Sequence, residues 1–291
     1  MTFPWQAADG EVFSGEQWTA PSSPRGRLIC IHGLGGAATD FTSLGEATAA
    51  RGFSAFAPNL RGQGCDPEEK RRGRFLEPNV LARDLTDFVT ALPASTAPVV
   101  LCGESLGALL VAWALSQRPF PFPLAGVILS VPVVDLKKPT PALGRALIRA
   151  LARIVPTLPL NATRFVTPRS EAPWEDNLTR DQAHVEYLRS APHRIRRFSV
   201  STLNALGNLM DARATLAAGL QVPTLVLAAG EDIYIAPTQV KAWFDQIAAE
   251  DKTFRLYPEA RHLLWNDFDR EQVIADILSW MEARCPRRAN L

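Results

Sequence analysis

The sequence predicts an α/β protein with a mostly parallel central sheet, flanking helices and one inserted helical segment. Short runs rich in Val, Ile and Leu alternate with longer helical patterns, which is typical of βαβ units. From about 131 to 220 this alternation stops, and helical patterns cut by prolines replace it. The composition, 47% hydrophobic and 21% charged over 291 residues, is that of a globular chain with a large core.

The strands are expected at six apolar runs that end at Gly, Ser or Pro. Ahead of them, Asp9-Gly10 is a hairpin signal between two short segments and predicts an antiparallel edge. The six runs are LICI (28–31), FSAFA (53–57), PVVLC (98–102), LAGVILS (124–130), PTLVLAA (223–229) and FRLY (254–257).

The helices are expected between these strands, where apolar residues recur at helical spacing. The clearest pattern is the last, which predicts one apolar face made of Phe268, Val273, Ile277, Leu278 and Met281. The expected helices span about 39–51, 77–92, 105–117, 237–249 and 268–284.

The stretch 131–220 is too long for an ordinary loop between a strand and a helix. We interpret it as a helical cap inserted into a core made of 1–130 and 221–291. The insert carries 13 Lys and Arg against 7 Asp and Glu, a net charge of +6, which leaves 18 against 23, or −5, for the rest. A basic cap on an acidic body is therefore expected.

Charge and cysteine content exclude several classes of protein. With 31 basic and 30 acidic residues the net charge is +1, which argues against a nucleic-acid partner. The four cysteines form no CxxC pair, so no zinc site or disulfide framework is expected. The N-terminus has no basic and apolar leader, and no apolar stretch approaches roughly 18 residues. We expect a soluble, cytoplasmic protein that needs no metal or organic cofactor.

The segment Gly103-Glu104-Ser105-Leu106-Gly107 matches the pattern GxSxG. It directly follows the expected strand PVVLC and precedes the helical pattern LLVAWAL. This order of strand, tight turn and helix lifts a serine hydroxyl out of the sheet, whereas the alternative is an ordinary Gly-Ser turn. We expect Ser105 to be a catalytic nucleophile.

A serine nucleophile needs a base, normally a histidine. His262 lies in the loop after the last expected strand, at the sheet edge where ligands bind in such folds. His184 and His193 lie in the insert, where surface positions are expected, and His32 follows an early strand. We expect His262 to be the base.

The histidine in turn needs a carboxylate that orients it. Asp232 follows the expected strand 223–229, so the chain order Ser, Asp, His matches that of the α/β-hydrolases. Glu231 is the rival, and the pattern from Asp232 to Ile235 favours Asp232. Asp211 and Asp267 are expected on the solvated surface.

Acyl transfer also requires donors for the developing oxyanion. The N–H of Leu106, the residue after the nucleophile, is one candidate, and the N–H of Leu34 in the glycine-bearing turn 32–36 is the second. His32 is then expected to fix this turn.

Four segments together resemble the serine hydrolases of the α/β-hydrolase superfamily, and among them the monoacylglycerol lipase and lysophospholipase-like group. HGLGG (32–36) resembles the family's oxyanion loop, and APNLRGQGCD (57–66) resembles its Asp-Leu-Arg-Gly-His-Gly-x-Ser segment. GESLG (103–107) resembles its nucleophile turn, and YPEARHLLWND (257–267) its histidine loop. The likeness covers roughly 1–130 and 221–285 and implies an α/β-hydrolase fold.

The resemblance implies Ser105 as nucleophile, His262 as base, Asp232 as orienting acid, and the Leu34 and Leu106 N–H groups as oxyanion donors. Three positions depart from the family's pattern: Asn59 replaces Asp, Gln63 replaces His and Leu263 replaces Glu. These departures weaken any transfer of substrate specificity.

The expected reaction is two-step hydrolysis of a carboxylic ester, of the monoacylglycerol or lysophospholipid type, through an acyl-enzyme. An amidase or peptidase would use the same triad, but it should carry carboxylates in the cap to bind an amine. An acyltransferase would also use the same residues. A ligand-binding protein without catalysis would need no triad.

One helical pattern in the insert, 142–155, is strongly amphipathic. Its apolar side holds Leu143, Leu147, Leu151, Ile154 and Val155. This side is expected either to shape an apolar acyl tunnel or to pack the cap on the body. The arginines at 145, 149 and 153 form a stripe on the same helix, which predicts either transient contact with anionic lipid head groups or a solvated helix surface.

Overall fold

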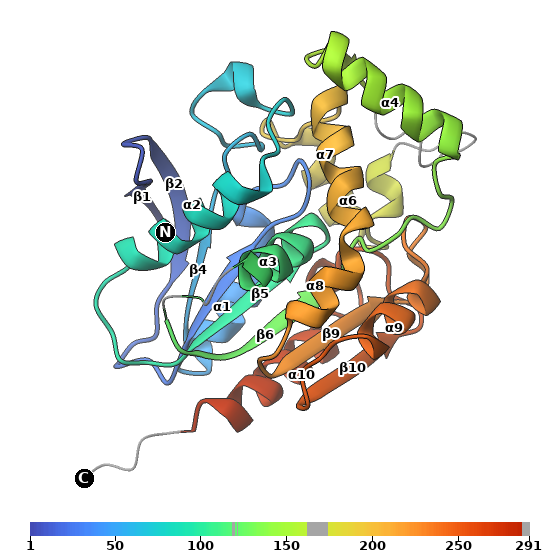
Figure 1. Cartoon of the computed structure of the whole chain (residues 1–291). Coiled ribbons are helices and arrows are strands. Elements are labelled where there is room, and N and C mark those ends of the chain that lie inside the picture. Colours follow the sequence, from blue (N-terminus) through green and yellow to red (C-terminus); the bar gives the residue numbers. More distant parts are fainter. Residues whose placement is uncertain (118–119, 121, 162–173, 287–291) are drawn as a thin grey trace.

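An eight-stranded sheet forms the centre of the computed structural model, which describes residues 1–117, 120, 122–161 and 174–286 (Figure 1). The first two strands are antiparallel to their neighbours, and the others run parallel. The hairpin expected at Asp9-Gly10 joins these first two strands, with Gly10 at φ 88°. In spatial order the strands are β1 (Thr2–Gln6), β2 (Val12–Trp18), β4 (Ser54–Pro58), β3 (Arg27–Ile31), β5 (Val99–Glu104), β6 (Leu124–Ser130), β9 (Thr224–Ala229) and β10 (Lys252–Tyr257).

Helices cover both faces of this sheet, which explains why its inner strands are apolar throughout. One face packs against α2 (Pro78–Ala91), α3 (Leu106–Gln117), α8 (Arg213–Gly219) and α9 (Pro237–Asp245). The opposite face packs against α1 (Thr42–Ala50) and α10 (Arg270–Arg284). The α/β class and the six parallel strands predicted from the sequence are confirmed.

The apolar face predicted for the last helix is correct except at its first residue. Val273, Ile277, Leu278 and Met281 are buried, but Phe268 is 64% exposed. Because α10 begins only at Arg270, Phe268 precedes the helix, and its ring lies 5.4 Å from the Arg180 guanidinium.

The segment between β6 and α8 lies at one end of the body (Figure 1). Its residues 162–173 lie outside the described part of the chain. Beside helices the segment contains two short antiparallel strands, which the sequence did not predict because each has only two residues. Its elements are α4 (Ala142–Ile154), β7 (Pro159–Leu160), the 3-10 helix η3 (Trp174–Asn177), α6 (Gln182–Ser190), β8 (Phe198–Ser199) and α7 (Val200–Asp211).

Ion pairs join the basic insert to the acidic body. Arg180 binds Asp267 at 3.1 Å and Asp269 at 2.6 Å, and the Arg194 side chain reaches Asp40 at 3.3 Å. Asp267 is fully buried, so its expected surface position is wrong. Its carboxylate also accepts the backbone N–H groups of Arg180 and Arg261, which makes it an anchor for the insert.

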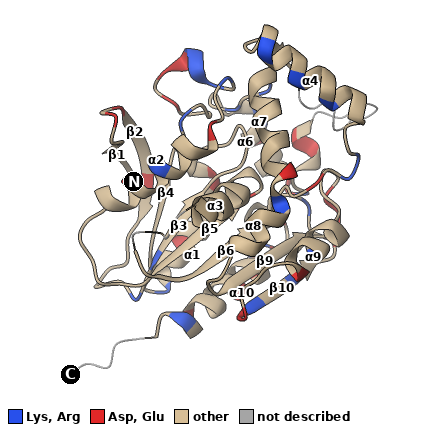
Figure 2. Ribbon diagram, viewed as in Figure 1, with Lys and Arg blue, Asp and Glu red and all other residues tan. Residues whose placement is uncertain are grey.

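The amphipathic helix α4 lies on the surface and packs against α7. Leu143 is 82% exposed, Leu147 57%, Ile154 76% and Val155 40%, so these four residues neither shape a tunnel nor pack the cap on the body, whereas Leu151 is half-buried. Arg145 and Arg149 bind Asp211 of α7 at 3.4 and 3.0 Å, and Figure 2 shows basic residues spaced along α4. Within the described ranges, no helix has both the length and the apolarity needed to cross a bilayer.

Candidate active site

Ser105 lies in a tight turn between β5 and α3. Its φ of 54° is in the left-handed region, which a residue with a side chain rarely adopts, and this strain directs the hydroxyl away from the sheet. The two glycines of the motif are required by space: a Cβ on Gly103 would meet the Gly107 carbonyl O at 2.4 Å, and one on Gly107 would meet the Ile31 carbonyl O at 2.0 Å. The GxSxG pattern is therefore explained by the close packing of β5, α3 and β3.

His262 and Asp232 form a buried pair on the two loops that follow β10 and β9. The distance from His262 Nδ1 to Asp232 Oδ2 is 2.6 Å. Since a carboxylate only accepts, Nδ1 carries the proton and Nε2 remains free to act as a base. The other oxygen, Asp232 Oδ1, accepts the N–H groups of Tyr234 and Ile235 at 2.8 and 3.2 Å, which fixes the carboxylate. Glu231, the rival residue, is exposed.

The environment of His262 favours its charged form. Burial alone lowers the pKa of the imidazole, but the charge and hydrogen bond of Asp232, together with the Glu104 carboxyl, outweigh it and raise the pKa above its ordinary value. This arrangement stabilises the imidazolium that forms when the histidine accepts a proton.

The other three histidines have different surroundings. His32 Nδ1 donates to the Gly33 carbonyl at 2.9 Å and Nε2 accepts the Leu60 N–H at 3.2 Å, while burial lowers its pKa to about 4. It is thus a neutral residue that fixes the turn 32–36. His184 and His193 are half-buried within the insert, where burial lowers their pKa, and are less exposed than expected.

The turn 32–36 lies directly against the nucleophile. A Cβ on Gly33 would be 3.3 Å from Ser105 Cβ and 3.9 Å from Ser105 Oγ. The N–H groups of Gly35 and Gly36 donate to Gln63 Oε1 and to the Gly33 carbonyl. Leu34 directly precedes these two glycines and lines the cavity. Leu106 begins α3, where N–H groups have no partner within a helix.

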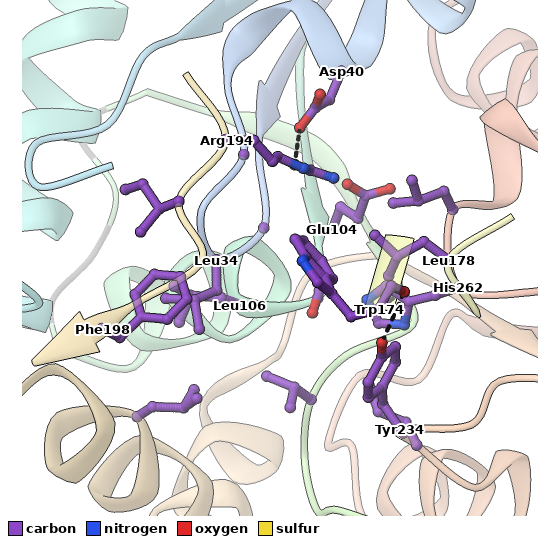
Figure 3. A pocket seen from close by; sticks show the side chains of 18 of the residues that line it. Leu34, Asp40, Glu104, Leu106, Trp174, Leu178, Arg194, Phe198, Tyr234 and His262 are labelled. Carbon is purple, nitrogen blue, oxygen red and sulfur yellow. Dashed lines mark hydrogen bonds and ion pairs between the residues drawn. The ribbon is translucent and has the colours of Figure 1, made fainter. Parts of the chain in front are cut away.

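Ser105 and His262 line one cavity of about 150 Å³ between the body and the insert (Figure 3). Its walls are mainly apolar, and the insert contributes Val133, Leu136 and residues between Trp174 and Leu206, whereas α4 contributes none among the described residues. The apolar lining residues are Leu34, Leu106, Val133, Leu136, Leu178, Ile195, Phe198, Leu206, Ile235 and Leu263.

The family of the chain follows from comparison with known proteins. Residues 22–269 match the family Hydrolase_4, described as serine aminopeptidase, S33. The chain belongs to this family of α/β-hydrolases. The α/β-hydrolase fold predicted from the sequence is thereby confirmed, and similar monoacylglycerol lipases confirm the predicted resemblance to that group.

Two curated relatives match most of this α/β-hydrolase. It is 24% identical over 277 residues to the monoacylglycerol lipase of Mycolicibacterium smegmatis, a match that covers 91% of this chain and 90% of the relative. It is 27% identical over 259 residues to the phospholipase YtpA of Bacillus subtilis, a match that covers 88% and 95% of the two chains.

Solved structures of similar folds cover nearly the whole chain. The monoacylglycerol lipase of Paleococcus ferrophilus superimposes with a TM-score of 0.78 at 24% identity, covering 93% of this chain and 98% of that one. A soluble variant of the Saccharomyces cerevisiae monoglyceride lipase in complex with a substrate analog gives a TM-score of 0.82 at 19% identity, covering 96% and 94%.

Sequence reasoning missed four charged residues of the cavity, namely Asp40, Glu104, Arg194 and Arg196. Of these residues, only Glu104 could have been noticed in the sequence, because it occupies the variable position directly before the serine of the GxSxG pattern. Burial raises the pKa of Glu104 to about 8, with a further increase from the charge of Asp40. Arg194 lies 154 positions from Asp40, so no local pattern could indicate their pairing.

Proposed function

We propose that this α/β-hydrolase cleaves carboxylic esters by a Ser105, His262, Asp232 triad through an acyl-enzyme. The observation that carries the proposal is the buried His262 and Asp232 pair, bonded at 2.6 Å, in one cavity with a strained serine. The chain is a carboxylic ester hydrolase in this account, and the insert 131–220 acts as the cap over its site.

The reaction has two steps. His262 Nε2 takes the proton of Ser105 Oγ, which attacks the ester carbonyl, and the N–H groups of Leu34 and Leu106 bind the oxyanion. His262 then protonates the leaving alcohol. In the second step the histidine takes a proton from water, which attacks the acyl-enzyme and releases the acid and the free serine.

The substrate proposed is an acyl ester of the monoacylglycerol or lysophospholipid type. The relatives named monoacylglycerol lipase and phospholipase support this class, and the apolar walls around Ser105 suit an acyl chain. The exposed apolar row of α4, Leu143, Leu147 and Ile154, would contact the surface of lipid aggregates. Since Arg145 and Arg149 already bind Asp211, apolar contact rather than charge would dominate there.

A peptidase function is a weaker candidate, although the family is described as serine aminopeptidase. An aminopeptidase needs unpaired carboxylates to bind the substrate ammonium group. Here Asp40 is paired with Arg194, and Glu104, whose pKa is raised to about 8, is mostly uncharged at neutral pH. The Arg194 guanidinium also lines the cavity and would repel an ammonium group. An acyltransferase would differ only in the acceptor that replaces water, and a pure receptor would not need the bonded His262 and Asp232 pair.

The test is hydrolysis of p-nitrophenyl esters from acetate to palmitate by the purified protein, with Ser105→Ala in parallel. The proposal expects activity that the variant loses, and the chain length of the best substrate measures the acyl site. A fluorophosphonate should label the wild type and not the variant. Activity that survives in Ser105→Ala, or no activity with any ester by a folded protein, would refute the proposal.

A further inference from the structure

Four buried polar atoms in the wall of the cavity have no hydrogen-bond partner among the described residues. They are Glu104 Oε1, Asp40 Oδ1, Arg194 Nε and the indole nitrogen of Trp174. Figure 3 shows the first three side chains directed toward one another on one side of the cavity, away from Phe198, Leu34 and Leu106. Because a buried polar atom without a partner costs about 1–3 kcal/mol, such a cluster marks a place where water or the polar groups of a ligand supply the missing bonds.

The chemistry of these atoms defines the ligand. Arg194 Nε and the Trp174 indole can only donate, while Asp40 Oδ1 can only accept as part of its ion pair with Arg194. Because its pKa is raised to about 8, the Glu104 carboxyl is mostly protonated at neutral pH, so it can donate as well as accept. Groups that both donate and accept, such as hydroxyls, fit this wall.

The charge of the wall is also balanced. Arg194 neutralises Asp40, with their side chains 4% and 2% exposed, and its guanidinium lies 5.3 Å from the centre of the Trp174 ring. The two arginines of the cavity are already paired, Arg194 with Asp40 and Arg196 with Glu175. A phosphate placed here would therefore meet the Asp40 carboxylate without an unpaired cation to balance its charge. An uncharged hydroxyl group carries no such penalty.

Glu104 lies on the side of the site where an alcohol leaves. It directly precedes Ser105 at the end of β5, and it lies close enough to His262 and Arg194 to interact electrostatically with both. In the proposed reaction His262 protonates the departing alcohol, so that alcohol must lie next to the histidine. The polar wall is therefore within reach of the alcohol part of the ester, while the apolar walls remain for the acyl part.

We propose that Glu104, together with Asp40 and Arg194, binds the free hydroxyl groups of an uncharged polyol ester, and so selects monoacylglycerols over lysophospholipids and over simple alkyl esters. This inference rests on the proposed ester hydrolysis and deepens it. Glu104 is a specificity residue here, because its contact is with the substrate's alcohol rather than with the scissile bond.

The test compares three water-soluble butyrate esters, so that lipid aggregation plays no part. Monobutyrin is the glyceryl ester, propyl butyrate is the same molecule without its two hydroxyl groups, and 1-butyrylglycerol 3-phosphate adds a charge. We expect the wild type to show kcat/KM for monobutyrin at least about tenfold above either of the other esters, as expected for hydrogen bonds made with one substrate and not with another.

The variant Glu104→Leu should reduce the ratio of kcat/KM for monobutyrin over propyl butyrate by about tenfold, while Glu104→Gln, which keeps a donor and an acceptor, should retain most of it. Any effect of Glu104 on the pKa of His262 changes both esters equally and leaves the ratio unaffected. Asp84→Asn is the matched control, because Asp84 is also a buried carboxyl whose pKa burial raises, but neither it nor its partner Arg61 lines the cavity.

A wild-type ratio near one would overturn the inference without any variant, and so would a ratio that Glu104→Leu leaves unchanged. If Glu104→Leu does not fold, as judged by circular dichroism, the wild-type ratios and Glu104→Gln still decide. If the wild type hydrolyses none of these esters, or if Ser105→Ala hydrolyses them equally well, the proposed function itself is refuted.

Discussion

Replacing Asp232 by Asn tests how the carboxylate controls His262. In the native protein Oδ1 accepts two backbone N–H groups and Oδ2 accepts the Nδ1–H of His262 at 2.6 Å. An asparagine must keep its oxygen toward the two N–H donors, so its NH₂ group faces the histidine. Nδ1 then becomes an acceptor, the proton moves to Nε2, and Nε2 can no longer take the proton of Ser105.

The expected loss for Asp232→Asn is roughly 10⁴-fold in kcat, the size of effect seen when a triad histidine is held in the wrong tautomer. Since Asp232 raises the pKa of His262, its removal should also lower that pKa. The base must be neutral to act, so wild-type activity falls as the pH drops through the raised pKa. In the variant this acid limb should move to lower pH.

The assay for Asp232→Asn is kcat/KM with p-nitrophenyl butyrate across pH 5 to 9, at equal folded fraction. A variant within tenfold of the wild type, or an acid limb that does not move, would refute the assignment of Asp232 as the partner of His262. Glu231→Gln is the matched control, because Glu231 is adjacent but exposed, and it should leave both kcat and the limb unchanged.

Two further predictions concern packing and the lipid surface. Gly107→Ala places a Cβ 2.0 Å from a β3 carbonyl and should lower the free energy of unfolding by about 3 kcal/mol in urea titrations, whereas Gly207→Ala in open space on α7 should not lower it. A Gly107→Ala protein of native stability would contradict the packing. Leu147→Ser on α4 should reduce hydrolysis of aggregated long-chain monoacylglycerol several-fold and leave p-nitrophenyl butyrate unaffected. Leu256→Ser, at a similarly exposed leucine on β10, should change neither, and equal loss in both leucine variants would argue against α4 contact.

Local sequence patterns were sufficient to predict the elements that carry the site. The apolar runs before Ser105 and Asp232 are strands buried on both faces. The sequence of such a strand is a continuous run of apolar residues, which can be recognised without knowing the neighbouring strands. The turn that carries Ser105 was predictable because it requires glycine at 103 and 107, where a Cβ would lie less than 2.5 Å from a backbone carbonyl oxygen.

Features that depend on distant partners were not predictable. Asp267 resembled a surface carboxylate, but it is buried because Arg180, 87 positions away, supplies its charge partner. The apolar side of α4 was expected to be covered, and yet periodicity alone does not say what covers it. Here the helix uses another side against α7 and leaves Leu143 and Leu147 exposed.

The central claim, that Ser105 becomes acylated during ester hydrolysis, is tested most directly by rapid quenching with p-nitrophenyl butyrate, followed by intact mass and peptide mapping. The account predicts a burst of p-nitrophenolate and a butyryl group on Ser105, both absent in Ser105→Ala. Turnover with the butyryl group on another residue, or turnover that persists in Ser105→Ala, would contradict it.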